Sequence, residues 1–234
     1  MLKQPIFVTG TDTNVGKTVV CAWLVHHLQA DYWKPVQCGD LHHTDAMEVA
    51  RLSKKLPHKL PHVITSKEET YQSGVIHPEA YQFTQSLSPH LAAEKNGITI
   101  DLTKIQIPAT KNRLIIEGAG GVLVPVNRHQ YMTDMIKYLN ARVLVVSRGT
   151  LGTINHTCLT LEYMRAKGMA VMGVIINGVS EKSNRESIEY FGRVKVLAEL
   201  PFMHHLDHAD LSSHEMTQKT RDLLEQATND RAFS

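Results

Sequence analysis

The stretch that most constrains how this chain can fold is "TGTDTNVGKT", residues 9–18 of 234. The apolar run over residues 5–10 predicts a strand that leads into it, and residues 17–29 predict a helix that follows it. A Gly-Lys-Thr sequence between a strand and a helix is typical of a phosphate-binding loop, in which backbone amides and the positive end of the helix hold the anion. The sequence therefore predicts a nucleotide-binding loop at this point.

The loop differs from the common phosphate-binding pattern in its length. Five residues separate Gly10 from Gly16, whereas the common pattern has four between its glycines. Because backbone amides make the cradle, the extra residue predicts a particular subfamily of loop and leaves binding intact. Lys17 can reach the terminal phosphates, and the Thr18 hydroxyl can ligate Mg²⁺.

Strands and helices alternate along the rest of the chain. Apolar runs typical of buried strands cover residues 32–36, 113–118, 142–147, 170–177 and 194–201. Helices are predicted over residues 44–54, 88–96, 133–140, 152–167, 181–192 and 213–228. This alternation predicts an α/β, P-loop NTPase fold with a mostly parallel β-sheet of about seven strands, flanked by helices on both faces. We expect residues 1–234 to form a single domain, in which 56–112 is the least regular part.

Composition argues against several classes of function. The formal net charge is +2 and no basic block is present, so we expect no nucleic-acid partner. No apolar run approaches the ~20 residues of a membrane span, and the N-terminus lacks a signal-peptide pattern. Three widely spaced cysteines suit a reducing compartment, which makes the cytoplasm the expected location. The histidines have no cysteine partners at metal-site spacing and are interpreted as surface or core residues, including the groups His26-His27, His42-His43 and His204-His205-His208.

Polar residues follow the predicted strands, at the edge where parallel sheets bind ligands. Lys34 taken alone could equally be a surface lysine, but beside the phosphate loop it is interpreted as neutralising a transferred phosphoryl group. Asp45 follows Thr44 at a helix start, where simple capping is the favoured local interpretation and an Mg²⁺ carboxylate the functional one. Glu117 ends an apolar strand before a glycine-rich turn, which fits an acid that holds a metal ion or a water.

Two further motifs leave alternatives open. "SRGTLGTINHT" (147–157) offers a second helix N-terminus to an anion such as a substrate carboxylate, through residues including Gly152 and Asn155, or it is an ordinary capped turn. Asn177 ends a predicted strand, where its carboxamide could pair with an adenine edge or belong to an Asn-Gly turn.

Taken together, these motifs resemble one enzyme family. "TGTDTNVGKT", "WKPVQCG", "TDA", "EGAGG", "LGTINH" and "IIN" occur in this order from residue 9 to 177, and the set is similar to that of the ATP-dependent dethiobiotin synthetases, ligases of biotin biosynthesis. The longer loop is characteristic of that family. The resemblance implies that CO₂ adds to an amine of 7,8-diaminononanoate, that ATP phosphorylates the carbamate to a mixed anhydride, and that the second amine closes a cyclic urea.

The resemblance also implies roles for individual residues. Lys17, Lys34 and Thr18 are the expected catalytic residues, and Thr18, Asp45 and Glu117 are expected to hold Mg²⁺. The expected ATP contacts are Asn14, Val15, Gly16, Lys17, Thr18, Val19, Asp45, Glu117, Gly118, Ala119, Gly120, Asn177, Pro201, Phe202 and Met203. The expected substrate contacts are Thr13, Lys34, Cys38, Gly152 and Asn155. The family works as a homodimer, in which the "LGTINH" loop of one subunit meets the substrate carboxylate bound by the other.

Two residues depart from the family pattern, and two other classes of protein compete with it. Asn14 stands where the family commonly has an acid, and Cys38 stands where it commonly has serine. An amide synthetase of the same superfamily would need a further glutamine-handling domain, for which 234 residues leave no room. A partition or septum-positioning ATPase switch is the alternative of a different class, and it leaves Lys34 and "LGTINH" unexplained.

Overall fold

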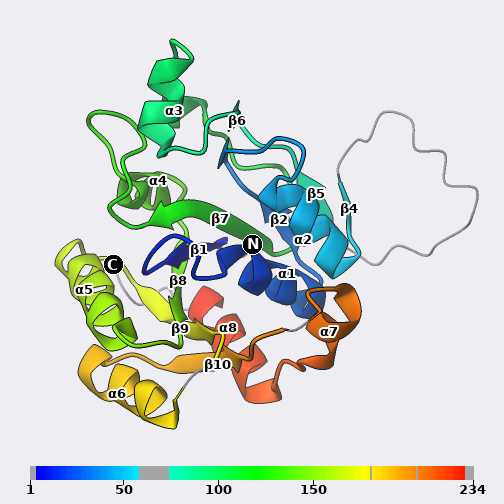
Figure 1. Ribbon diagram of the computed structural model, residues 1–234, viewed down its shortest axis with the longest axis vertical. Coiled ribbons are helices and arrows are strands. Elements are labelled where there is room, and N and C mark those ends of the chain that lie inside the picture. The colour runs from blue at the N-terminus through cyan, green and yellow to red at the C-terminus, as the bar shows by residue number, and fades with distance from the viewer. Residues whose placement is uncertain (1–3, 58–73, 180, 204, 230–234) are drawn as a thin grey trace, which may run out of the picture.

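The computed structural model describes residues 4–57, 74–179, 181–203 and 205–229 (Figure 1). Its main sheet has eight strands in the order β10-β9-β8-β1-β7-β2-β5-β4, and all neighbouring strands are parallel. The predicted parallel α/β fold is confirmed, with one strand more than expected. The strands are β1 (Ile6–Gly10), β2 (Asp31–Trp33), β4 (Leu56–Pro57), β5 (Val75–His77), β7 (Leu114–Gly121), β8 (Arg142–Arg148), β9 (Val171–Asn177) and β10 (Val196–Leu200).

The predicted strand over residues 32–36 has the wrong boundaries, because two short strands share this segment. β2 ends at Trp33, and the chain then enters a separate sheet of two parallel strands. Pro35 lies at the break: it lacks an N–H for a ladder, and its carbonyl accepts instead from two backbone N–H groups at the start of β6 (Tyr81–Phe83). The break leaves Lys34 directly after β2. The second sheet consists of β3 (Val36–Cys38) and β6 (Tyr81–Phe83).

Helices cover both faces of the main sheet (Figure 1), because alternate residues of its strands point to opposite sides. The helices are α1 (Lys17–Leu28), α2 (Asp45–Ser53), α3 (Pro89–Lys95), α4 (Met132–Tyr138), α5 (Thr153–Ala166), α6 (Lys182–Gly192), α7 (His208–Ser213) and α8 (Gln218–Asn229). In β1, Ile6 and Val8 belong to the core shared with α1, α2, α7 and α8, whereas Phe7 belongs to the core shared with α3 to α6. No helix in the described part of the chain is long and apolar enough to cross a membrane.

The predicted last helix over residues 213–228 is wrong at its start, since two helices occupy this region. The backbone carbonyl of His214, just after α7, accepts from the indole N–H of Trp23 in α1 at 2.6 Å. Before α8, the Thr217 hydroxyl accepts from the backbone N–H of Thr220 at 3.1 Å, which satisfies a donor at the helix start. These contacts end one helix and begin the next.

The histidines of α1 are half-buried and lie beside α7. The ring of His26 contacts those of His27 and His208 edge to face, with centroids 4.8 and 5.0 Å apart. Burial, followed by the two neighbouring histidines, lowers the pKa of His26 to about 4. Among the described residues, no group of three or more His, Cys, Asp or Glu side chains is arranged to hold a metal ion. His204, part of one predicted histidine group, lies outside the described residues.

Candidate active site

A cleft of about 1060 Å³ opens at the carboxyl ends of β1, β2 and β7. Parallel strands end here and the next helices begin, so backbone amides and strand-end side chains meet at one edge. Much of the predicted site lines this cleft: Thr13, Asn14, Gly16, Lys17, Thr18, Val19, Lys34, Cys38, Asp45, Glu117, Ala119 and Gly120. The structure therefore brings together residues that lie up to about a hundred positions apart in the sequence.

The phosphate loop contains two residues with left-handed backbone conformation. Gly16 has φ 88°, and a Cβ there would lie 2.0 Å from the side-chain nitrogen of Asn177. Asn14 has φ 59°, a conformation that asparagine adopts more readily than most residues. The same Asn177 amide donates to the Val15 carbonyl at 3.2 Å. Asn177 thus contacts the back of the phosphate loop, and glycine is needed at position 16 to let it approach.

Lys17 begins α1 with its side chain mostly buried in the cleft. Only 7% of the residue is exposed, and its ammonium donates to the Asp12 carbonyl at 3.3 Å. Burial lowers the pKa of Lys17, while the nearby Glu117 opposes that shift. The lysine therefore lies across the loop, pointing where a phosphate would meet the loop amides.

Three oxygen-bearing side chains converge beside Lys17. The Thr18 hydroxyl lies 2.7 Å from Asp45 Oδ1 and 3.0 Å from Glu117 Oε1. Capping of α2 is performed by Thr44, whose hydroxyl accepts from the Met47 backbone N–H at 3.2 Å. Asp45 is consequently free of the capping role that local sequence favoured, and its carboxylate faces the cluster.

Lys34 joins the two carboxylates of this cluster. Its ammonium forms an ion pair with Asp45 and another with Glu117 Oε1, the latter at 3.3 Å. Burial lowers the pKa of Lys34, but the charges of Glu117 and Asp45 outweigh it and raise that pKa overall. Burial raises the pKa of Asp45, and Lys34 outweighs this and holds it below the usual value. Glu117 is only 1% exposed, which is unlike a carboxylate in a plain strand-end turn.

The cluster has the chemistry of a magnesium site. One hydroxyl and two carboxylates supply hard oxygen ligands, the kind that Mg²⁺ prefers, and their oxygen atoms lie within 3.0 Å of Thr18 Oγ1. Lys34 supplies a positive charge to the same two carboxylates. The residues present therefore fit a divalent cation.

Cys38 ends β3 at the other side of the cleft and is partly buried. Burial raises the pKa of its thiol to about 11, and the charge of Lys34 opposes this only in part. The side chain is therefore a protonated thiol at neutral pH, and a thiol is a weak hydrogen-bond donor.

The glycines that follow Glu117 serve close packing. A Cβ at Gly118 would lie 2.6 Å from the Phe7 ring. Gly120 has φ 66°, and a Cβ there would lie 2.6 Å from a methyl group of Val124. These positions let β7 run past β1 and turn over the cleft.

Some predicted site residues do not line this cleft. Val15 is buried in the core beneath the loop, and Gly152 and Asn155 lie at the start of α5, where Asn155 is exposed. Residues 201–203 follow β10. The set outside the cleft comprises Val15, Gly118, Gly152, Asn155, Asn177, Pro201, Phe202 and Met203.

Sequence reasoning missed several residues of the cleft. Ser86, Leu87 and Ser88 line it from the loop before α3, within the irregular tract 56–112. Tyr32 donates its hydroxyl to Glu117 Oε2 at 2.9 Å from beneath the cleft floor. Tyr32 could have been predicted from its spacing, because residues two apart in an extended chain point to the same side and Lys34 follows it by two.

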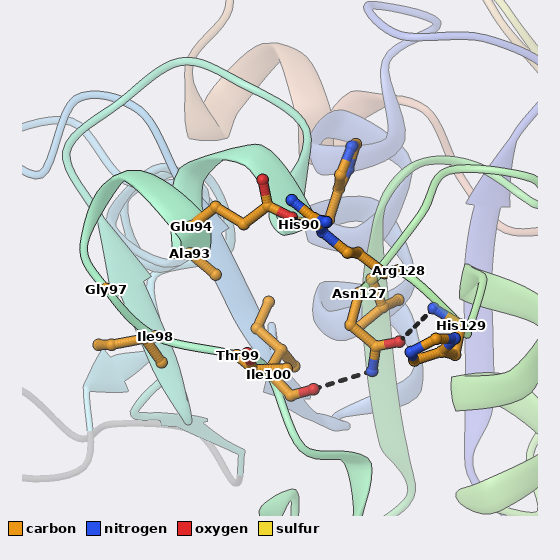
Figure 2. Close-up of a pocket in the computed structure, with 11 residues that line it drawn as sticks. His90, Ala93, Glu94, Gly97, Ile98, Thr99, Ile100, Asn127, Arg128 and His129 are labelled. Atoms are coloured by element: carbon orange, nitrogen blue, oxygen red, sulfur yellow. Dashed lines mark hydrogen bonds and ion pairs between the residues drawn. The ribbon is translucent and has the colours of Figure 1, made fainter.

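A second cavity of about 550 Å³ lies between α3 and the loop that follows β7 (Figure 2). Its polar groups are engaged with one another. Arg128 pairs with Glu94 at 2.6 Å, and the Asn127 amide donates to the Ile100 carbonyl at 2.9 Å. None of the predicted site residues lines this cavity.

Comparisons with known proteins agree with this geometry. The chain superposes on a ParA family ATPase from Chlorobium tepidum with TM-score 0.55 and 13% identity, covering 97% of this chain and 98% of that one. It superposes on the septum site-determining protein MinD of Pyrococcus horikoshii with TM-score 0.54 and 13% identity, covering 96% and 94%. These likenesses concern the fold alone. Together with the loop and its cleft, they define the fold class of the P-loop nucleoside triphosphatases.

Sequence comparison identifies the family of the chain within this class. A family model described as an AAA domain matches residues 4–210. The ATP-dependent dethiobiotin synthetase of Paramagnetospirillum magneticum is 44% identical over 83% of this chain and 86% of its own length. The ATP-dependent dethiobiotin synthetase of Lawsonia intracellularis is 41% identical over 93% of this chain and 98% of its own length. The chain belongs to the ATP-dependent dethiobiotin synthetase family.

Proposed function

We propose that the protein converts 7,8-diaminononanoate, CO₂ and ATP into dethiobiotin, ADP and phosphate, with Mg²⁺ as its metal. The observation that carries this proposal is the cluster at the phosphate loop, where two lysines and two carboxylates surround the Thr18 hydroxyl. Membership of the family supplies the identity of the substrate.

The first part of the reaction makes a better leaving group from the carbamate. A carbamate oxygen attacks the γ-phosphorus of ATP, the bond to the β-phosphate oxygen breaks, and ADP leaves. Thr18, Asp45 and Glu117 would hold Mg²⁺, which would neutralise part of the negative charge of the phosphates. Lys17 stabilises the transferred phosphoryl group from the side of the loop, and Lys34 holds the carbamate and the same group from the side of β2.

The second part closes the ring. The other amine attacks the carbonyl carbon of the mixed anhydride, loses a proton, and phosphate leaves with its oxygen. Neither this acyl substitution nor the phosphoryl transfer before it needs a side-chain nucleophile, so both depend on positioning and charge. The buried Lys17, Lys34 and Glu117 of the cleft support that mechanism.

Lys34 has to change partners during the reaction. It is paired with Asp45 and Glu117 in the structure. A divalent cation held by the two carboxylates would supply positive charge in place of the ammonium, which would leave Lys34 available to the carbamate and the phosphate. Its proposed catalytic role and its observed ion pairs therefore belong to two states of one site.

The protein is proposed to act as a homodimer. Gly152 caps the start of α5 and, like Asn155, lies outside its own cleft. In a homodimer, Asn155 at this helix N-terminus would meet the substrate carboxylate bound in the cleft of the other subunit. Asn177 ends β9, and residues 201–203 follow β10. We propose that these residues contact the adenine ring of ATP.

ADP release measures the proposed function. Purified protein with Mg-ATP and bicarbonate should release ADP only when 7,8-diaminononanoate is added, and mass spectrometry should detect the cyclic urea. Slow ADP release that ignores the diamine would instead favour a nucleotide switch of the partition or septum type.

Serine in place of Cys38 should retain or improve affinity for the diamine. A hydroxyl donates a stronger hydrogen bond than a thiol whose pKa is raised to about 11. Steady-state kinetics should give a KM for the diamine equal to or up to about tenfold below that of the parent, since a hydrogen bond contributes on the order of 1 kcal/mol. Cys158→Ser, in α5, is the matched control. A large rise in KM in Cys38→Ser alone would show that the position is used differently.

A further inference from the structure

A buried tyrosine contacts the inner end of the carboxylate cluster. Tyr32 in β2 is fully buried, and its hydroxyl donates to Glu117 Oε2 at 2.9 Å. Tyr32 pairs in register with Ile115 of β7, so Glu117 lies two residues further along the same face and within reach of a long side chain. Thr18 and Lys34 contact the other oxygen, Oε1. The two oxygens of Glu117 thus have separate partners.

The tyrosine hydroxyl is a donor in this contact. A phenol carries its proton at neutral pH, and the carboxylate oxygen Oε2 of Glu117 can only accept, so the 2.9 Å contact has the tyrosine as donor. A carboxylate that is 1% exposed needs such donors, because water cannot reach it to solvate the charge.

We infer that Tyr32 is a positioning residue for the metal site: its hydroxyl fixes Oε2 of Glu117 and thereby directs Oε1 towards Thr18 and the cleft. The inference rests on the proposed function, in which Glu117 holds Mg²⁺. Hydrogen bonds that orient metal-binding side chains typically contribute about ten- to a hundredfold in metal affinity or activity. The ring of Tyr32 fills the core, but a phenylalanine would fill it equally well, so the hydroxyl has the separate role.

Tyr32→Phe tests this role, because it removes one oxygen atom and keeps the ring. The Mg²⁺ concentration for half-maximal turnover should rise about tenfold or more, while the KM for the diamine stays unchanged. Calorimetry without turnover should show that Mg²⁺ strengthens ADP binding less in this variant than in the parent. Tyr81→Phe is the matched control, since Tyr81 lies in β6 and its hydroxyl also has a hydrogen bond, from the Asp101 backbone at 3.3 Å.

Glu117→Gln separates failure of the inference from failure of the proposed function. If Glu117→Gln leaves the Mg²⁺ dependence unchanged, the proposed metal role of Glu117 is wrong. If Glu117→Gln weakens the Mg²⁺ response and Tyr32→Phe behaves like Tyr81→Phe, the metal role stands and the role of Tyr32 is overturned. A fall in kcat at saturating Mg²⁺ with no shift in the Mg²⁺ requirement would also overturn it, because a purely structural tyrosine would give that result.

Discussion

Lys17→Ala should lower turnover by about two to three orders of magnitude at saturating ATP, as loss of a preorganised charge at a transition state typically does. The ammonium of Lys17 is buried across the phosphate loop, 7% exposed, so water replaces it poorly. Phosphoryl transfer spreads negative charge over oxygens at this position, and Lys17 is the loop's own cation. The KM for the diamine should change far less than kcat, because the loss acts on the transferred phosphoryl group.

The melting temperature of Lys17→Ala distinguishes loss of catalysis from misfolding. Burial lowers the pKa of Lys17, which means that the fold disfavours its charged form. Removal of the ammonium should therefore leave the melting temperature unchanged or raise it. Lys182→Ala is a suitable control, because the Lys182 side chain is 89% exposed on α6. Normal turnover in Lys17→Ala would contradict the proposed role.

The phosphate loop and the main sheet were predictable because their signals are local. The glycines, the lysine and the strand before them lie within residues 5–18, and the buried strands read as continuous apolar runs. The alternation of core faces in β1, with Ile6 and Val8 on one side and Phe7 on the other, follows from strand geometry alone.

The second sheet could not be predicted in this way. β3 and β6 have three residues each, too few to show a period, and they pair across more than forty positions. Their pairing depends on where Pro35 breaks the chain. The cleft residues Ser86 to Ser88 were missed for the same reason, because they follow β6 and their position depends on how β6 pairs.

The side-chain contacts at the site also could not be predicted from the local sequence. Local sequence placed Thr44 at the N-cap and left Asp45 between capping and metal binding, and only the structure shows that Asp45 faces Lys34. Asn177 was interpreted as an adenine contact or part of a turn, and its contact with Val15 in the phosphate loop was not predicted. Both contacts join residues from different strands or helices, so they depend on the packed sheet.

Lys34→Ala should have two separable effects, the first on stability. Without Mg²⁺ the variant leaves Asp45 and Glu117 without their cation, and Glu117 is 1% exposed. Removing one partner of a buried ion pair costs about 3–5 kcal/mol, and the partial exposure of Asp45 places the expected loss at the lower end, near 3 kcal/mol. Denaturant unfolding in the presence of a chelator measures this directly.

The second effect concerns Mg²⁺ and turnover. Because a divalent cation would supply the missing charge, Mg²⁺ should raise the melting temperature of Lys34→Ala more than that of the parent. Turnover should still fall by about two orders of magnitude or more with Mg²⁺ present, since the carbamate and the transferred phosphoryl group lack their second lysine.

Lys55→Ala is the control for loss of a buried lysine, because Lys55 donates to the neutral Gln29 side chain at 2.6 Å and lies outside the cleft. It should show no added response to Mg²⁺. If Lys34→Ala responds to Mg²⁺ no more than Lys55→Ala does, then Lys34 and the metal do not share the two carboxylates. Lys34 would then have to act from its ion pairs, without the exchange of partners that the proposed reaction requires.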